Sequence, residues 1–414
     1  MRFIHAADIH LDSPLSGLTA RAEGRATRLA GATRRAFHGL IGFALEQRVD
    51  FMVIAGDLFD GDWPDFSTGL AFAEGMGRLA QAGIRVAIVR GNHDAESKMT
   101  RKLSLPPTVT MFGARKAETL VWDDLGVALH GRSFGQGHES ANLARDYPPA
   151  RPGLFNIGLL HTAATGRPGH EGYAPCSLED LVARGYDYWA LGHVHAREEL
   201  SREPWIVFSG NLQGRHANET GAKGCTLVTV EAGRVVSVEA VDLDVVRWVR
   251  CEIDLAVCGD WDDLAEAVRA ALARELAAAG GRTLAARLTL SGRSRLHRRL
   301  AGDPERAASE CANGAAQAGD VWIERVITRT TDPAASAGGA PGALTDLIGA
   351  IEAVRTAPAE REALRAGIET LLGRIPAEIR GIAGLGDLTD DALAGLLADA
   401  GALLLDRLFD DQGT

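Results

Sequence analysis

The first half of the chain alternates short apolar runs with longer amphipathic segments. Residues 2–7, 49–57 and 84–94 are apolar runs of strand length, and each leads into polar residues. Between them, residues 32–47 and 66–83 carry apolar side chains at the three- and four-residue spacing of helices. Strands that alternate with helices in this way predict a sheet whose faces are covered by helices.

Shorter strand-like runs follow in the next part of the chain. They cover residues 127–134, 155–162, 186–195, 205–210 and 225–241. The last run is split by Ala232 and Gly233, a pair typical of a hairpin turn. We therefore expect a layered α/β domain over residues 1–245.

A second pattern begins after this domain. Strand-like runs at residues 247–257, 282–292 and 320–331 alternate with helical segments at residues 260–280 and 294–318. This β-α-β-α-β order predicts a small α/β capping domain over residues 246–331.

The C-terminal part has a different composition again. Residues 332–343 have the Pro, Gly, Ala and Ser content of a linker, and residues 344–414 predict acidic amphipathic helices rich in leucine. An apolar stripe on such a helix fits a groove on a partner protein. The alternative is a helical hairpin that folds back on its own domain.

The amino-acid composition limits the kinds of protein that this chain can be. A chain of 414 residues with 46% hydrophobic and 24% charged residues is typical of a soluble protein of two or three domains. The five cysteines show no CxxC spacing, so we expect free thiols in a reducing compartment. No apolar run reaches the roughly 18 residues of a membrane helix, and the N-terminus lacks a signal peptide pattern. We expect a cytoplasmic protein without a membrane partner.

The net charge of −11 argues at first against a nucleic-acid partner. The acidity is unevenly distributed, however. Residues 1–250 carry 27 basic and 29 acidic side chains, whereas residues 251–414 carry 17 basic and 26 acidic ones. A nearly neutral N-terminal part that also holds bound cations is compatible with a phosphate substrate.

Polar side chains follow the predicted strands of the first domain at the points where the strands end. They are Asp8, His10, Asp57, Asp60, Asn92, His93, Asp94, His161, His193 and His195. Because ligands bind at the carboxyl ends of the strands in an open α/β sheet, we expect these side chains to meet at one edge. Each motif alone is weak, since a histidine after a strand is often structural, but their common placement predicts a metal site.

The types of ligand narrow the choice of metal. Carboxylate, amide and imidazole groups without a thiolate suit Mn²⁺, Fe²⁺ or Zn²⁺. Seven ligands among these ten side chains are too many for one ion and fit two ions that share a bridging carboxylate. Paired metal ions, roughly 3.5 to 4 Å apart, are typical of enzymes that displace groups at phosphorus.

The ordered motifs D-x-H, G-D-x-x-D, G-N-H-D, an isolated histidine and G-H-x-H resemble those of calcineurin-like metallophosphoesterases. This resemblance covers about residues 1–245 and implies a layered metallophosphoesterase β-sandwich flanked by helices. The variants "HAADIHLDSPL", "AGDLFD", "GNHD" and "GHVH" are most similar to DNA-repair exonuclease subunits of the SbcD type, in particular their YhaO-like branch. The segment "FSGNLQGRHANETGAKG" at residues 208–224 strengthens that resemblance.

The resemblance also implies roles for individual residues. It assigns Asp8, His10 and His195 to one metal ion and Asn92, His161 and His193 to the other, with Asp57 as the bridge. It places His93 over the scissile phosphate, with Asp60 as the residue that orients it. Several double-strand-break nucleases have histidine at the position of Asp60, so this partner resembles the phosphatase version. Asp12 and Asp94 receive no role.

Three functions remain open at this point. The first is an Mn²⁺-dependent DNA exonuclease or endonuclease for DNA repair, in which the second domain shapes access to DNA. Its candidate DNA-binding residues are Arg293, Arg295, Arg298 and Arg299, for which the alternative is a solvated helix face. The second is a nucleotide or other small-molecule phosphodiesterase. A protein phosphatase is disfavoured, because "DLFDGDW" lacks the Arg-Gly pair of those enzymes.

The third function is mainly that of a scaffold subunit. Proteins of the SbcD type work with a large coiled-coil ATPase that carries a P-loop, and residues 344–414 resemble the segment that grips this partner. A homodimer is also open.

Overall fold

The computed structural model describes most of the chain. The described residues are 1–15, 31–61, 66–96, 104–164, 173–333, 349, 357–372, 393, 397 and 400. They divide into two compact units. One comprises Met1–Cys251, Leu272–Arg287 and Ala318–Arg325, and the other comprises Glu252–Ala271, Leu288–Gln317 and Val326–Thr414.

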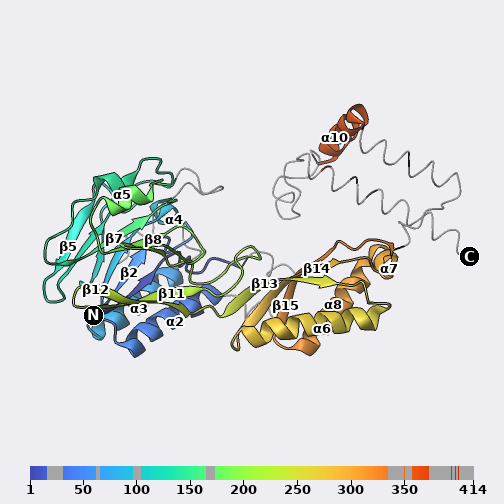
Figure 1. Cartoon of the computed structure of the whole chain (residues 1–414), viewed down its shortest axis with the longest axis horizontal. Helices are drawn as coiled ribbons and strands as arrows, with labels where there is room; N and C mark the ends of the chain where they lie inside the picture. Colours follow the sequence, from blue (N-terminus) through green and yellow to red (C-terminus); the bar gives the residue numbers. More distant parts are fainter. Residues whose placement is uncertain are drawn as a thin grey trace, which may run out of the picture. The chain divides into compact units, whose positions relative to one another are not determined.

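Two six-stranded sheets build the N-terminal part of the first unit (Figure 1). The first has the order β12-β11-β1-β2-β3-β4, with β1 to β4 parallel, β11 antiparallel to β1 and β12 antiparallel to β11. Its strands are β1 Arg2–Ala6, β2 Phe51–Ala55, β3 Arg85–Val89, β4 Val109–Met111, β11 Gly224–Glu231 and β12 Arg234–Asp242.

The second sheet has the order β5-β6-β7-β8-β10-β9. Its four inner strands are parallel, and the strands at both edges are antiparallel to their neighbours. The strands are β5 Glu118–Trp122, β6 Val127–Gly131, β7 Phe155–His161, β8 Tyr188–Gly192, β9 Glu198–Arg202 and β10 Trp205–Phe208. The parallel inner strands of both sheets therefore end in loops that can converge on one site.

The two sheets pack face to face. Alternate residues of β1 point to opposite faces, so that Phe3 lies between the sheets and Ile4 lies on the outer face. The ring of Phe3 stacks on that of Phe51 at 4.9 Å between centroids and meets the edge of Tyr188 at 5.3 Å. The predicted sandwich of sheets is confirmed.

Helices cover the outer faces of the sandwich. On the first sheet, α2 (Ala32–Gln47) and α3 (Phe66–Gln81) bury one apolar stripe each, as the sequence predicts. On the second sheet lie the short elements η2 (Leu143–Asp146) and α5 (Leu178–Val182). The layers are therefore helix, sheet, sheet and helix.

The remaining strands form a three-stranded sheet in the order β13-β14-β15. The elements are β13 Val246–Asp254, α6 Trp261–Ala278, β14 Thr283–Ser291, α7 His297–Gly302, α8 Pro304–Ala318 and β15 Val321–Thr328. The single helix predicted over residues 294–318 is wrong. The helix breaks at Asp303, because the residue before a proline is disfavoured in the helical conformation and Pro304 begins α8.

Several other expectations can be compared with the structure. All five cysteines are free and buried, as predicted. None of the helices among the described residues is long and apolar enough to cross a membrane. In the C-terminal part, α10 (Pro358–Leu372) is described, whereas most of the predicted linker and of the predicted partner-binding segment lies outside the described residues. The predicted domain boundaries stay predictions.

Candidate metal centre

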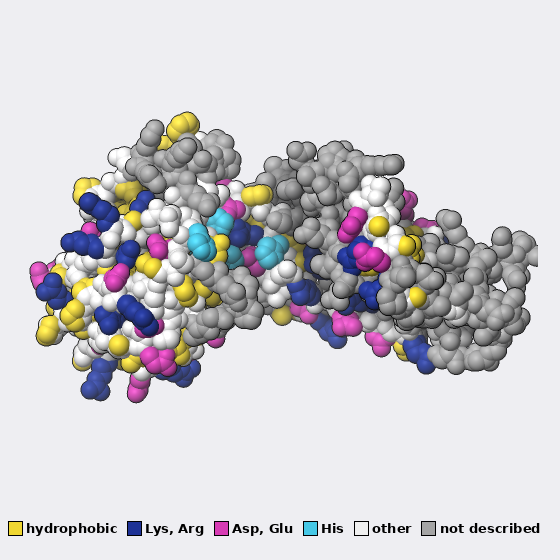
Figure 2. Space-filling model, turned by 90° about the horizontal axis from the view of Figure 1, so that it is seen from above, with side chains coloured by type: hydrophobic (Ala, Val, Ile, Leu, Met, Phe, Trp, Pro, Cys, Tyr) yellow, Lys and Arg dark blue, Asp and Glu magenta, His cyan; other side chains and the backbone are white. Residues whose placement is uncertain are grey.

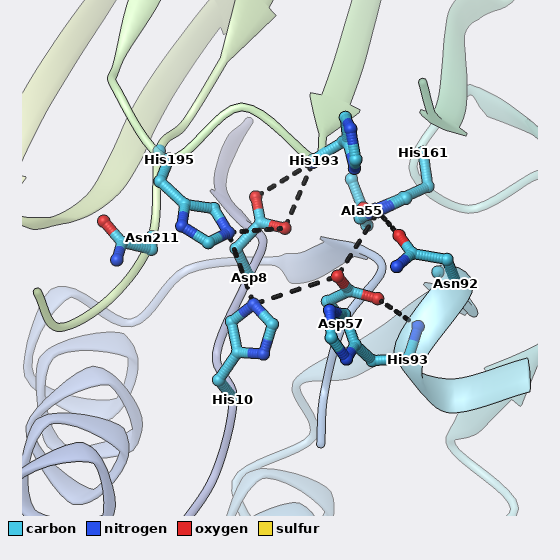
Figure 3. Close-up of polar contacts among 12 residues, drawn as sticks. Asp8, His10, Ala55, Asp57, Asn92, His93, His161, His193, His195 and Asn211 are labelled. Atoms are coloured by element: carbon cyan, nitrogen blue, oxygen red, sulfur yellow. Dashed lines mark hydrogen bonds and ion pairs between the residues drawn. The ribbon is translucent and has the colours of Figure 1, made fainter. Parts of the chain in front are cut away.

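Five loops bring the candidate ligands together at the carboxyl ends of parallel strands from both sheets (Figure 3). Asp8 and His10 follow β1, and Asp57 and Asp60 follow β2. Asn92 and His93 begin α4 (Asn92–Glu96) after β3, His161 ends β7, and His193 and His195 follow β8. The predicted meeting of these segments at one edge is what the structure shows.

The backbone of these loops adopts conformations that ordinary residues avoid. Asp8, His10, Asp57 and His193 have positive φ angles of 50°, 43°, 50° and 99°. Backbone hydrogen bonds between loops hold this geometry, from Asp8 N to Gly56 O at 3.0 Å and from His10 N to Asp57 O at 3.0 Å. Strain of this kind concentrates at functional sites, where the surrounding structure compensates for it.

Two glycines allow the loops to approach each other. Gly56 has a φ of 97°, and a Cβ atom there would collide with Nδ1 of His161. A Cβ atom on Gly91 would collide with the carboxylate of Asp57. The glycine of each "GD" and "GN" motif therefore makes room for a neighbouring candidate ligand, in addition to forming a turn.

The polar atoms form two overlapping groups that share Asp8. One group is Asp8, His10 and His195, the other is Asp8, Asp57 and His161, and the ligand atoms within each lie within 4.8 Å of one another. Amide oxygen Oδ1 of Asn92 lies 3.0 Å from Nε2 of His161.

His193 belongs to neither of these groups, as far as the described residues go. Its backbone N–H donates to both carboxylate oxygens of Asp8, at 3.1 and 3.0 Å, and its ring centroid lies 5.1 Å from that of His161. His193 therefore lies beside the second group and fixes the orientation of the shared carboxylate.

The electrostatics of the centre fit bound cations. Burial raises the pKa of Asp8 well above its ordinary value, and the nearby charge of Asp57 raises it further. Burial likewise raises the pKa of Asp57 to about 6. Two buried carboxylates so close together repel each other, and a cation between them relieves that repulsion.

The imidazole rings of the centre also fit bound cations. Burial lowers the pKa of His161 to about 3, so its ring is neutral and carries one N–H. Both ring nitrogens nevertheless face acceptors, because Nδ1 lies 3.0 Å from Ala55 O, and Nε2 lies close to Asn92 Oδ1 and 3.5 Å from Asp57 Oδ2. One proton cannot serve both sides. A metal ion on the Nε2 side would satisfy the lone pair and the facing oxygens together.

A second set of lone pairs meets at His10. Its Nε2 lies 3.3 Å from Nε2 of His195, while Nδ1 of His195 donates to Glu219 Oε1 at 2.6 Å. Nδ1 of His10 is buried and makes no hydrogen bond, since the 3.6 Å to Asp60 Oδ1 is too long. The residues present therefore fit a pair of divalent metal ions.

His93 and Asp60 form a hydrogen-bonded pair beside these groups. His93 Nδ1 lies 3.0 Å from Asp60 Oδ1, and the backbone N–H of His93 donates to Asp57 Oδ1 at 3.1 Å. The hydrogen bond with Asp60 raises the pKa of His93, although burial opposes the shift. The side chain of His93 is 39% exposed, so it is accessible to a substrate. Figure 2 shows histidine side chains gathered on one face beside Lys and Arg side chains.

Sequence reasoning missed a supporting carboxylate. Glu219 is buried and accepts hydrogen bonds from His195 Nδ1 at 2.6 Å, Asn211 Nδ2 at 2.9 Å and the backbone N–H of Arg215 at 2.6 Å. The available signal was the polar segment 208–224, which served only as part of the family resemblance. A carboxylate behind a histidine fixes the ring tautomer and leaves Nε2 free to bind metal.

The structure gives Asp12 and Asp94 structural contacts. Asp94 is buried and accepts from the backbone N–H groups of Leu58, Phe59 and Gly91. Asp12 accepts from both Arg34 and Thr68. Asp94 thus fastens the loop after β2 to the loop after β3.

The predicted DNA-binding arginines do not lie in the unit that holds the candidate ligands. Arg293, Arg295, Arg298 and Arg299 are exposed and belong to the second unit. Arg298 forms an ion pair with Asp332 at 2.9 Å. Their proposed contact with DNA stays a prediction.

Comparison with known proteins identifies two matching regions. Residues 1–197 match the calcineurin-like phosphoesterase family, and residues 248–331 match the middle domain of metallophosphoesterase YhaO. The chain is 36% identical to the uncharacterized metallophosphoesterase YhaO of Bacillus subtilis over 62% of this chain and 63% of that protein.

Lower similarity extends to two archaeal proteins, each named DNA double-strand break repair protein Mre11. The identity is 27% for that of Methanopyrus kandleri, over 64% of this chain and 61% of the relative. It is 24% for that of Sulfurisphaera tokodaii, over 59% and 63%. The matches thus span less than two thirds of the length of each relative.

The family match and the geometry of the centre agree. The matched region contains every predicted metal ligand, and the glycines that make room for those ligands lie within it. Residues 1–197 of the chain therefore form a calcineurin-like phosphoesterase domain.

Proposed function

We propose that the chain is a two-metal, Mn²⁺-dependent phosphodiesterase that acts as a DNA nuclease in repair. The observation that carries the proposal is the pairing of two overlapping ligand groups with an exposed imidazole beside them. The groups share Asp8, and His93 lies next to both, because its backbone N–H donates to Asp57 and its ring centroid lies 5.2 Å from that of His10. This arrangement suits the hydrolysis of a phosphate ester.

The proposed ligands divide into two sets. Asp8, His10 and His195 would hold one ion, and Asn92, His161 and His193 would hold the other, with Asp57 as the proposed bridge. The neutral rings of His10 and His161, whose pKa burial lowers to about 3, keep lone pairs available for metal over the whole physiological pH range. When bound, the ions polarise the phosphoryl oxygens and lower the pKa of a water molecule.

His93 and Asp60 supply the proton transfer. His93 donates a proton to the leaving oxygen of the ester, and the hydrogen bond with Asp60, which raises the pKa of His93, favours the protonated ring. Asp60 accepts the hydrogen bond from Nδ1 of His93 at 3.0 Å, which directs the other ring nitrogen toward the substrate. Asp60 is thus a positioning residue for the general acid.

Two features support DNA as the substrate. The Mre11 relatives are named as repair proteins of DNA double-strand breaks, at 24–27% identity. The second unit exposes Arg293, Arg295, Arg298 and Arg299, whose charges suit a phosphate backbone.

Purified protein reloaded with Mn²⁺ tests this function. We expect about two ions per chain, metal-dependent hydrolysis of bis-p-nitrophenyl phosphate, and degradation of linear DNA. Hydrolysis of the diester with intact DNA would identify a nucleotide or other small-molecule phosphodiesterase instead. One ion or none, with no hydrolysis, would overturn the proposal.

We also propose a coiled-coil P-loop ATPase as the partner, bound by residues 344–414. Truncation after Pro333 should leave metal content and diester hydrolysis unchanged and abolish assembly with the ATPase, measured by size-exclusion chromatography of the mixture. Loss of diester hydrolysis on truncation would place these residues in the catalytic body.

A further inference from the structure

Arg215 brings a guanidinium group to the edge of the candidate metal centre. It lies in the loop after β10, and its side chain is 14% exposed. Nη1 lies 3.2 Å from Ser13 Oγ and 3.3 Å from Asp60 Oδ2. The other oxygen of Asp60 is the one that contacts His93. A single carboxylate therefore separates the guanidinium from the proposed general acid.

Most of the hydrogen-bonding capacity of this guanidinium is unused by the part of the chain that the structure describes. A guanidinium carries five N–H donors. Among the described residues, the side-chain hydrogen bonds of Arg215 all come from Nη1, and Nε is buried without a partner. A buried donor without a partner costs free energy unless a ligand or water accepts its hydrogen.

The backbone places Arg215 rigidly with respect to the proposed ligands. Its N–H donates to Glu219 Oε2 at 2.6 Å, and Oε1 of the same carboxylate accepts from His195 at 2.6 Å. The buried side chain of Glu219 therefore fixes both the ring of His195 and the backbone of Arg215. Such rigidity suits a residue that must hold a substrate at a defined distance from the metal ions.

From these contacts we infer that Arg215 is a phosphate-binding residue, which donates from its unused nitrogens to a non-bridging oxygen of the phosphate group. The inference rests on the proposed phosphodiesterase function and deepens it. A planar guanidinium next to His93 stabilises the negative charge of the phosphate where the leaving oxygen is protonated.

A purely structural role for Arg215 would be to anchor Asp60. That anchoring does not require the arginine, because Ser13 Oγ already donates to Asp60 Oδ2 at the shorter distance of 2.9 Å. The two anchors offer a direct test. Ser13→Ala loosens Asp60 and keeps the guanidinium, which retains its contact with Asp60 and loses the one with Ser13, whereas Arg215→Gln removes the guanidinium and leaves the serine bond.

The experiment measures the binding of inorganic phosphate to the full chain loaded with Mn²⁺, by titration calorimetry. We expect Arg215→Gln to weaken phosphate binding on the order of 10- to 100-fold, with unchanged metal content. Arg215→Lys should recover only part of the loss, since an ammonium group lacks the planar donor pair. Ser13→Ala should bind phosphate as the wild type does and lower kcat alone.

A matched control is Arg202→Gln. Arg202 is an exposed arginine of the same unit whose partner is Glu199, and its replacement should change neither phosphate affinity nor turnover. Wild-type phosphate affinity in Arg215→Gln would overturn the inference even if diester hydrolysis is confirmed. A wild-type protein that binds metal but neither binds phosphate nor cleaves diesters would instead overturn the proposed function.

Discussion

His5 and His10 lie on either side of the end of β1, and they differ in what surrounds them. Both are buried, and burial lowers the pKa of each to about 3. His5 meets the hydroxyl of Tyr188 at 3.0 Å on Nδ1 and the carbonyl of Leu191 at 3.1 Å on Nε2. The hydroxyl can donate and the carbonyl can accept, so the neutral ring is fully satisfied.

His10 has no such complement. Its Nε2 faces Nε2 of His195 at 3.3 Å and Asp57 Oδ2 at 3.8 Å, and its Nδ1 makes no hydrogen bond. Burial and pKa are therefore alike for a structural histidine and for a candidate metal ligand. What separates them is whether the partners of the ring complete its one donor and one acceptor, or leave lone pairs facing each other.

The largest expected effect comes from removing Asp57, the proposed bridge between the two ions. Asp57→Ala should reduce the metal content from about two ions per chain to nearly none and abolish diester hydrolysis, measured by atomic emission and with bis-p-nitrophenyl phosphate. Asp124→Asn is the control, because Asp124 is exposed, forms an ion pair with Arg85 and is not one of the proposed ligands. Retention of both ions in Asp57→Ala would show that Asp57 is not needed to hold them.

The next largest effect belongs to His93. His93→Ala should keep both metal ions and lose about 100-fold in kcat, because its role is proton donation and not coordination. Asp60→Asn should lose less, about tenfold, since the ring remains but is no longer oriented by a carboxylate. Unchanged turnover of the model diester in His93→Ala would exclude the imidazole from proton transfer.

The positions of the proposed ligands were predictable because each follows a recognisable strand. The apolar run before Asp57 and the one before Asn92 fix where the chain leaves the sheet, and parallel strands end at the same edge. Glu219 was not predictable in the same way. It lies in a segment without regular structure, and only the folded chain brings its carboxylate to His195.

The missed elements have similar causes. β9 (EELSR) is a polar edge strand and lacks the apolar run that marks the inner strands, whereas β5 (ETLVW) is an edge strand whose apolar run is only three residues long. The break at Asp303 interrupts a segment whose apolar spacing alone continues through it. The break is marked instead by Pro304, because the residue before a proline is disfavoured in the helical conformation.

Glu219 supports the candidate ligand His195, whereas no carboxylate contacts the ring of the structural histidine His5 in the described residues. Glu219→Gln removes the charge that accepts the N–H of His195 and should weaken metal binding about tenfold, with kcat at saturating Mn²⁺ little changed. Competition with a fluorescent chelator measures the affinity. Glu199→Gln, which changes a carboxylate paired with Arg197 and Arg202, provides the matched control. Equal metal affinity of Glu219→Gln and the wild type would show that His195 needs no orienting partner.

Replacing His5 tests whether this histidine serves stability and not metal binding. His5→Phe fills the same space but leaves the hydroxyl of Tyr188 and the carbonyl of Leu191 unpaired, and should lower the free energy of unfolding by about 2 kcal/mol. Metal content should stay at the wild-type value. Urea denaturation of the metal-free proteins measures the first quantity. Loss of metal from a folded His5→Phe variant would show that the two histidines are not independent.

The smallest effect is a difference between the wild type and His5→Phe in how the free energy of unfolding depends on pH. Below its ordinary value of about 6.5, the unfolded His5 binds a proton, whereas the folded ring stays neutral down to a pKa of about 3. Lowering the pH through this window therefore favours the unfolded state, by at most about 1.4 kcal/mol per pH unit for one histidine. His5→Phe lacks this contribution, so its metal-free stability should fall less steeply between pH 6.5 and pH 5 in urea denaturation. Equal slopes would mean that His5 is protonated in the folded protein, and the hydroxyl and carbonyl partners would then not define a neutral ring.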